Sequence, residues 1–177
     1  MPEPAPPLTV EAVNALDRDA FAARFGDVFE HSPWVAADAW EARPFADAAA
    51  LQAALVAAMR AAPRERRLAL IRAHPDLAGR AAVAGGLTAA SRREQAGAGL
   101  DRLTPDEYAT LTAANGRYAE RFGFPFVICV RGQTKETILA ALSARVERSP
   151  EEEFETALDE IAAIARVRLE ALLPDRP

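Results

Sequence analysis

The chain has 177 residues, of which 50% are hydrophobic but only 7% aromatic, and its formal net charge is −5. This length suits one domain with a buried core, and the interspersed charges lack the basic stripe typical of nucleic-acid-binding proteins. Much of the hydrophobic fraction is alanine, which favours helices because it loses no side-chain entropy on folding. We therefore expect an all-α protein that does not bind nucleic acid.

Several features of the sequence indicate the cellular compartment in which the protein is expected. Cys129 is the single cysteine, so no internal disulfide can form, as is usual in a reducing compartment. No stretch approaches the ~18 consecutive apolar residues of a membrane span. The N-terminus has neither the basic region nor the apolar core of a signal peptide, and the C-terminus differs from the Ser-Lys-Leu peroxisomal signal. The expected location is the cytoplasm.

The first half of the chain predicts several short helices. Asp17 is a candidate N-cap for a helix whose apolar side chains recur at helical spacing, namely Phe21, Phe25, Val28 and Phe29. Asp47 can cap a long alanine-rich helix. Pro63 begins a short basic helix that ends at His74-Pro75, because the residue before a proline avoids the helical region.

The second half contains three clear helix starts and one extended run. Thr104, Thr134 and Ser149 each precede a helical pattern as candidate caps, and the last helix runs to about Leu173. Residues 124–130 form the one strand-like run. A lone strand is not stable, so we expect a buried extended connector whose backbone groups find other partners.

The organisation predicted from these elements is simple. Residues 1–8 form a flexible proline-rich tail. Residues 9–177 form one all-α domain, a bundle of roughly eight to nine helices, because no linker or internal repeat divides them.

His74 is the first candidate for chemistry. A histidine at a helix C-terminus is favourable for the helix dipole alone. It is also a candidate general acid or base, since the unperturbed imidazole pKa of ~6.5 suits proton transfer near neutral pH. His31 has the same structural explanation, and no acidic or amide cluster follows it closely.

Ser91-Arg92-Arg93-Glu94-Gln95 is the second candidate. Ser followed three residues later by Glu is the pattern of a capping box. The same helix start can present backbone amides to an anionic ligand, and the Gln95 amide can both donate and accept hydrogen bonds.

Arg168 lies close to the apolar face of the last helix, about 40° from its centre at a rotation of about 100° per residue. Such an arginine extends its charged end to solvent, pairs with a carboxylate, or holds a carboxylate or ureido carbonyl of a substrate.

Other kinds of chemistry lack support. Two histidines and one cysteine at unsuitable spacing do not resemble a zinc site. Walker, Gly-x-Gly-x-x-Gly, Gly-x-Ser-x-Gly and Cys-x-x-Cys motifs are all absent from the sequence.

Several segments together resemble the decarboxylase family that acts on 2-oxo-4-hydroxy-4-carboxy-5-ureidoimidazoline (OHCU) in uric acid degradation. They occur in the family's order from about residue 8 onward. The segments are Phe29-Glu30-His31-Ser32-Pro33-Trp34, Arg43-Pro44-Phe45, His74-Pro75-Asp76-Leu77-Ala78-Gly79, Ser91-x-x-Glu94-Gln95, Phe122-Gly123-Phe124-Pro125-Phe126-Val127-Ile128-Cys129-Val130-Arg131 and Arg168-Leu169.

The resemblance implies an all-α homodimer that needs no cofactor and no metal and produces (S)-allantoin. It implies that His74 is the catalytic acid or base and that Glu94 is essential for catalysis. The substrate-binding residues that it implies are Pro75, Ser91, Arg92, Arg93, Glu94, Gln95, Phe126, Val127, Ile128, Cys129, Val130 and Arg168.

Two other functions remain open from the sequence. The first is a helical interaction module that has kept the scaffold and lost catalysis. The second is a different lyase or hydrolase of a ureido or imidazole compound on the same scaffold.

Overall fold

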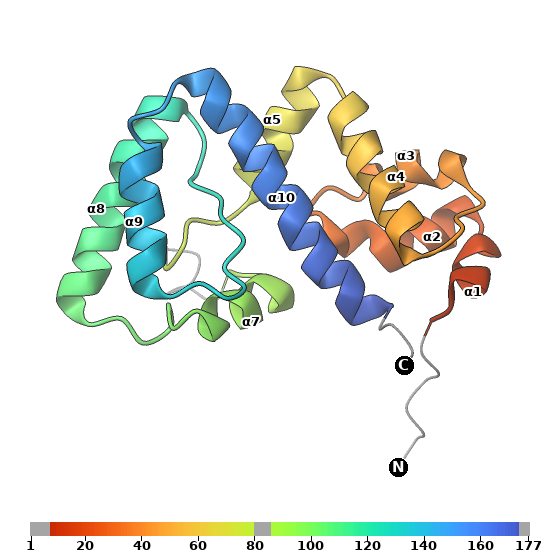
Figure 1. Ribbon diagram of the computed structural model, residues 1–177, viewed down its shortest axis with the longest axis horizontal. Coiled ribbons are helices and arrows are strands. Elements are labelled where there is room, and N and C mark those ends of the chain that lie inside the picture. The colour runs from red at the N-terminus through yellow and green to blue at the C-terminus, as the bar shows by residue number, and fades with distance from the viewer. Residues whose placement is uncertain (1–7, 80–85, 174–177) are drawn as a thin grey trace, which may run out of the picture. The chain divides into compact units, whose positions relative to one another are not determined.

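The computed structural model describes residues 8–79 and 86–173. Over these ranges the chain forms nine α-helices, two short 3-10 helices and no strand, which confirms the predicted all-α class. The helices are α1 (Val10–Asn14), α2 (Arg18–Phe25), α3 (Trp34–Ala39), α4 (Ala48–Ala61), α5 (Arg64–Ala73), α7 (Ala89–Gly97), α8 (Pro105–Phe122), α9 (Lys135–Arg145) and α10 (Pro150–Leu172), with η1 (Gly26–Val28) and η2 (Trp40–Ala42) between them (Figure 1).

Side-chain caps explain why most of these helices begin where they do. The Asp17 carboxylate accepts a hydrogen bond of 2.8 Å from the Ala20 N–H at the start of α2. Thr104 and Glu107 form a reciprocal capping box at α8. Thr134 caps α9 through the Thr137 N–H. Each of these caps satisfies an N–H that has no partner inside the helix, and each confirms the sequence prediction.

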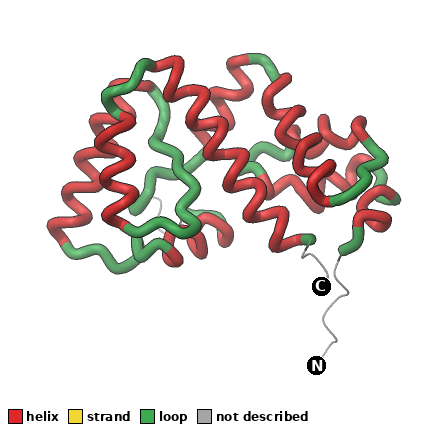
Figure 2. Tube along the Cα trace, in the orientation of Figure 1, coloured by secondary structure: helices red, strands yellow, loops and turns green. Residues whose placement is uncertain are grey.

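Residues 124–130, which we call the connector, are extended but belong to no sheet. Figure 2 shows them as a loop between α8 and α9. Gly123, with φ of 76°, ends α8 in the left-handed conformation that glycine adopts without steric cost. The connector then runs back along the helices, so that α9 starts again near the beginning of α8 and lies beside it (Figure 1). The prediction of an extended, largely buried connector is confirmed.

The chain divides into two compact units. The first comprises Met1–Arg67 and Ala165–Pro177, and the second comprises Leu68–Ile164. The boundaries fall inside α5 and α10. The single domain expected from the sequence stays a prediction, and residues 1–7 of the predicted tail lie outside the described residues.

Each unit has its own aromatic core. In the first unit, Phe21 packs against Phe25 and Phe45 with ring centroids 4.7 and 5.9 Å apart. Phe21, Phe25, Val28 and Phe29 are all buried as predicted, but they do not share one helix, because α2 ends at Phe25, η1 covers Gly26–Val28 and Phe29 is extended. In the second unit, Tyr118 packs against Phe126 at a centroid distance of 5.3 Å. That ring contact anchors the connector to α8.

None of the helices in residues 8–79 and 86–173 is long and apolar enough to cross a bilayer.

Candidate active site

His74 directly follows the last residue of α5, at the predicted break before Pro75. It is only 7% exposed, and its Nδ1 atom lies 2.9 Å from the carbonyl oxygen of Leu70. A carbonyl oxygen only accepts hydrogen bonds, so Nδ1 carries the proton and the neutral ring keeps its lone pair on Nε2. Burial and this hydrogen bond together fix the orientation of the ring.

Residues 74–79, which we call the His74 loop, are held by two amide side chains from other helices. The Gln95 side chain accepts a hydrogen bond of 2.9 Å from the Ala78 N–H, and the Asn115 side chain donates one of 3.0 Å to the Leu77 carbonyl. Ala78 has a φ of 50°, a conformation that costs an L-residue about 1–2 kcal/mol. The two amides supply hydrogen bonds that offset this cost, and they bind the loop that begins with His74.

Gly79 closes the same loop because only a glycine fits there. Its N–H donates to the Asp76 carbonyl at 3.2 Å. A Cβ atom at this position would lie 2.6 Å from the Asp76 Cβ, well inside the usual contact distance. Partial burial raises the pKa of the Asp76 carboxyl above its ordinary value, since a charged group loses hydration there.

The helix that carries Ser91 and Glu94 starts earlier than the sequence predicts. α7 begins at Ala89, and its N-cap is Thr88, whose hydroxyl oxygen accepts from the Ser91 N–H at 3.2 Å. The predicted capping box of Ser91 and Glu94 is therefore wrong. Thr88 gave only a weak signal, because no Glu or Gln stands three residues after it.

The five predicted site residues of α7 divide between its two sides. Ser91 and Gln95 are one turn apart and only 4% and 6% exposed, so both face the interior of the second unit. Glu94 is half-buried, whereas Arg92 and Arg93 are exposed. The Arg92 guanidinium donates to the Leu87 carbonyl at 3.3 Å.

Charged side chains bind two polar groups of the connector backbone. The Val127 carbonyl accepts a hydrogen bond of 2.8 Å from Arg145 Nη1, and the Cys129 N–H donates one of 2.8 Å to Glu160. The Val130 carbonyl accepts from the Gln133 N–H at 3.0 Å. Three polar groups of the connector thus have the predicted partners, and two of these partners are charged side chains, Arg145 and Glu160, that the sequence did not single out.

A buried cluster of ionisable side chains supports those contacts. Arg145 Nε donates to the Glu153 carboxylate at 3.0 Å, and the Tyr118 hydroxyl donates to the same oxygen at 2.5 Å. Burial, followed by the neighbouring carboxylate, raises the pKa of Tyr118 well above its ordinary value of 10.0. Tyr118 therefore stays protonated and remains a hydrogen-bond donor at neutral pH.

Arg168 belongs to the first unit, where it pairs with a buried acid. Its Nη1 lies 2.9 Å from a Glu30 carboxylate oxygen and 3.4 Å from the Val28 carbonyl. Glu30 is only 2% exposed. Of the open interpretations, pairing with a carboxylate is the one that the structure bears out.

A cavity of about 640 Å³ lies within the second unit beside α7. Ala78, Arg92, Gln95 and Tyr108 are among its lining residues, and His74 is not. Among residues 8–79 and 86–173, no group of three or more His, Cys, Asp or Glu side chains is arranged to hold a metal ion.

Comparison with known proteins gives a consistent result. The family model described as OHCU decarboxylase matches residues 14–170. The 2-oxo-4-hydroxy-4-carboxy-5-ureidoimidazoline decarboxylase of Haloferax volcanii is 47% identical over 162 residues, which cover 92% of this chain and 94% of that protein. The uric acid degradation bifunctional protein PucL of Bacillus subtilis is 38% identical over 168 residues, which cover 95% of this chain and 33% of that protein.

A solved structure agrees with these sequence matches. The crystal structure of (S)-allantoin synthase resembles this chain with a TM-score of 0.73 and 31% sequence identity. The match covers 94% of this chain and 54% of that one, so this chain spans about half the length of the solved chain. With a family match over most of its length and a relative at 47% identity, the chain belongs to the OHCU decarboxylase family, a family of carboxy-lyases.

Proposed function

We propose that the chain converts OHCU into (S)-allantoin in the degradation of uric acid, and that His74 protonates the product on one face. Family membership supports the reaction class. The observation that carries the proposal is the buried His74 ring. Its Nδ1 is bound to the Leu70 carbonyl, so Nε2 is the nitrogen through which a proton is exchanged.

The proposed reaction requires no cofactor, because the substrate contains its own electron acceptor. In OHCU the carboxylate stands on a carbon next to a ring C=N bond. When the bond to the carboxylate breaks, CO2 leaves and the electron pair moves toward this C=N bond, whose nitrogen takes up a proton. The enol-like intermediate is then protonated on carbon while its hydroxyl group loses a proton to become a carbonyl. One proton is consumed for each CO2 released.

His74 suits the carbon protonation, which decides the handedness of the product. A proton donor with a fixed direction delivers its proton to one face only. The ring of His74 is fixed by burial and by the hydrogen bond to Leu70. We assign Pro75 to the substrate contact surface beside it, since the proline ends α5 and turns the chain into the His74 loop.

We assign the remaining contacts in the second unit to α7 and the connector. Ser91 and Gln95 are proposed to bind polar groups of the substrate. Arg92 and Arg93 are proposed to attract its negative charge. Glu94 is proposed either to orient His74 or to accept hydrogen bonds from the ureido N–H groups, both of which need contacts of ~3 Å.

Backbone groups of Phe126, Val127, Ile128, Cys129 and Val130 were all predicted to line the substrate. The Val127 carbonyl and the Cys129 N–H already have side-chain partners. Ile128 stands between them, and its N–H and carbonyl point to the opposite edge of an extended chain. We therefore assign the main backbone contact to Ile128.

Arg168 is proposed to bind the carboxylate or the ureido carbonyl of the substrate. The planar fork of a guanidinium matches either group. Glu30 orients the guanidinium through an ion pair in which both side chains are buried.

The proposal also covers the oligomeric state, the cellular location and the partners of the protein. We propose a homodimer in the cytoplasm that has a small molecule as its partner, rather than nucleic acid or a membrane. The net charge of −5 and the interspersed charged residues support this choice of partner.

The decisive experiment supplies freshly made OHCU to the purified chain and follows the circular dichroism of the product. Spontaneous decay gives racemic allantoin without an optical signal, whereas the proposed enzyme gives one enantiomer. A product that remains racemic, with OHCU consumed at the spontaneous rate, overturns the proposal.

A further inference from the structure

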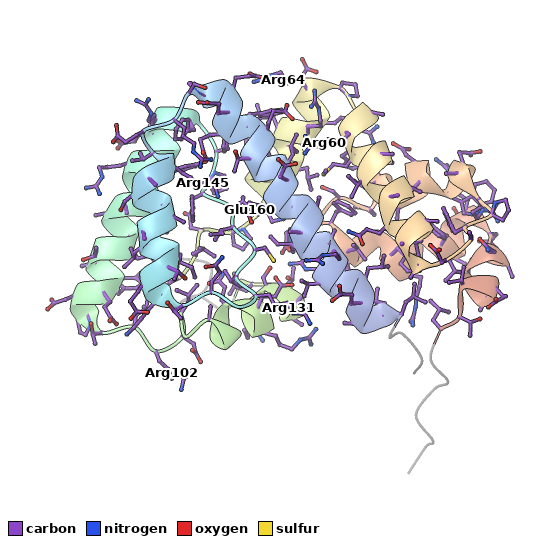
Figure 3. The ribbon with its side chains drawn as sticks, in the orientation of Figure 1. Arg60, Arg64, Arg102, Arg131, Arg145 and Glu160 are labelled. Atoms are coloured by element: carbon purple, nitrogen blue, oxygen red, sulfur yellow. The ribbon has the colours of Figure 1, made fainter. Side chains whose placement is uncertain are left out.

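We propose that Glu160 and Arg145 are positioning residues that hold the connector by one edge, so that the opposite edge presents Ile128 to the substrate. The inference rests on the proposed function and extends it to residues outside the predicted site. Figure 3 labels both side chains, which come from α10 and α9.

The backbone of an extended chain alternates in direction from one residue to the next. The polar groups of residues two positions apart point to the same edge, and those of the residue between them point to the other. Arg145 binds the Val127 carbonyl and Glu160 binds the Cys129 N–H, each at 2.8 Å. These contacts occupy one edge. Ile128 makes no backbone hydrogen bond to any residue that the structure describes.

Arg145 is held firmly enough to act as a fixed point. Its side chain is 5% exposed, and its Nε atom is bound to the fully buried Glu153. Its guanidinium carbon also lies 4.5 Å from the centroid of the Phe126 ring, which adds a cation–π contact with the connector itself. Buried ion pairs contribute little net stability, so stability alone does not explain the buried guanidinium of Arg145. Holding the connector in position does.

Glu160 is the residue on which the proposal can be tested most directly. Its side chain is 28% exposed and lies 4.0 Å from Arg145 Nη1, so it is less essential to the core than Glu153. Its hydrogen bond with Cys129 needs only an acceptor oxygen. Glu160→Gln retains such an oxygen, whereas Glu160→Leu removes it at similar size.

The experiment compares three variants by two measurements. The first is hydrogen exchange of the Cys129 amide, resolved by NMR in the free chain. The second is kcat/KM with OHCU, together with the enantiomeric purity of allantoin. The matched control is Glu152→Leu, which makes the same change on the same helix at an exposed residue that bonds with Ser149 instead of the connector.

Loss of one hydrogen bond in Glu160→Leu is expected to accelerate Cys129 exchange about tenfold, to lower kcat/KM about tenfold and to reduce enantiomeric purity. Glu160→Gln and Glu152→Leu are expected to stay within about threefold of the wild type by both measurements. A purely structural role would lower stability without changing the handedness of the product.

Two results overturn the proposal. In one, Cys129 exchanges at the wild-type rate in Glu160→Leu. In the other, Glu160→Leu lowers kcat/KM and enantiomeric purity no more than Glu152→Leu does. A wild-type chain that does not turn over OHCU overturns the proposed function separately, and the exchange rate of Cys129 still decides whether Glu160 holds the connector.

Discussion

The side chain of His74, just after α5, is bound at 2.9 Å to the carbonyl of Leu70, which lies four residues earlier in α5. This carbonyl belongs to the last turn of α5, where the helix no longer supplies N–H partners. One hydrogen bond thus caps the helix end and fixes the tautomer of the histidine. His74 can therefore both stabilise the end of α5 and serve as the proposed acid or base.

Replacing His74 tests its role as the proton donor. We expect His74→Asn to retain a hydrogen bond to Leu70 and the fold, and to lower kcat with OHCU by about 10²–10⁴-fold. The measurement is the rate above spontaneous decay, together with the thermal unfolding midpoint. The matched control is His31→Asn, because His31 is exposed and has a φ of 47°, which asparagine tolerates well. Equal activity of the two variants would contradict the role of His74.

The ion pair between Glu30 and Arg168 predicts an asymmetry between single and double variants. Glu30→Leu leaves a buried guanidinium without its carboxylate, and we expect the free energy of unfolding to fall by about 3–5 kcal/mol. The double variant Glu30→Leu/Arg168→Met is expected to recover most of this loss, and to bind substrate more weakly. Urea denaturation measures the first effect and KM the second. A single variant within about 0.5 kcal/mol of the wild type would contradict the buried pair.

The alkaline limit of stability is predicted to depend on Tyr118. Its folded-state pKa is raised, so its contribution is complete below pH 10.0, the ordinary pKa of the group. At higher pH the unfolded chain loses a proton that the folded chain retains. The free energy of unfolding then falls by up to about 1.4 kcal/mol per pH unit.

We expect Tyr118→Phe to remove this part of the slope in denaturation curves recorded above pH 10.0. Tyr108 is the other tyrosine of the chain and is 36% exposed, so Tyr108→Phe is the matched control that removes a hydroxyl outside the buried cluster. If both variants kept the wild-type slope, the buried hydrogen bond with Glu153 would not be present in solution.

Two glycines give a paired test of the His74 loop. Gly79→Ala places a Cβ 2.6 Å from the Asp76 Cβ, so the loop must shift. We expect a loss of about 1–3 kcal/mol in stability and a lower kcat. Gly97→Ala in α7 meets no atom within 4 Å, and it is expected to stabilise the chain by about 0.5–1 kcal/mol. Thermal unfolding and turnover of both variants check the prediction, and an equally stable and active Gly79→Ala chain would contradict it.

Helical composition and capping residues predicted most of the fold. Asp17, Thr104 and Thr134 cap helices where the sequence predicts them, because a cap acts over one turn and is visible in the local sequence. α7 is the exception. Its cap, Thr88, lacks the Glu three residues later that makes the start of α8 easy to identify, whereas Ser91 and Glu94 just after it have that spacing.

The candidate site was predictable only in part. His74, Ser91 and Gln95 stood out by residue type and spacing. Asn115 and Arg145 were missed, although each is a polar residue on an otherwise apolar helix face, the same signal that singled out Arg168. Their partners are a loop carbonyl 38 residues away for Asn115 and a connector carbonyl 18 residues away for Arg145, and helical periodicity carries no information about such distant contacts.

The backbone of the connector has a consequence for protein engineering. The substrate contact that we propose for the peptide group of Ile128 would survive most substitutions of its own side chain, because every residue except proline presents the same N–H and carbonyl. Libraries restricted to the connector will therefore recover mainly folding defects. Altered substrate preference is to be sought by mutating α9 and α10, whose side chains hold the connector in place.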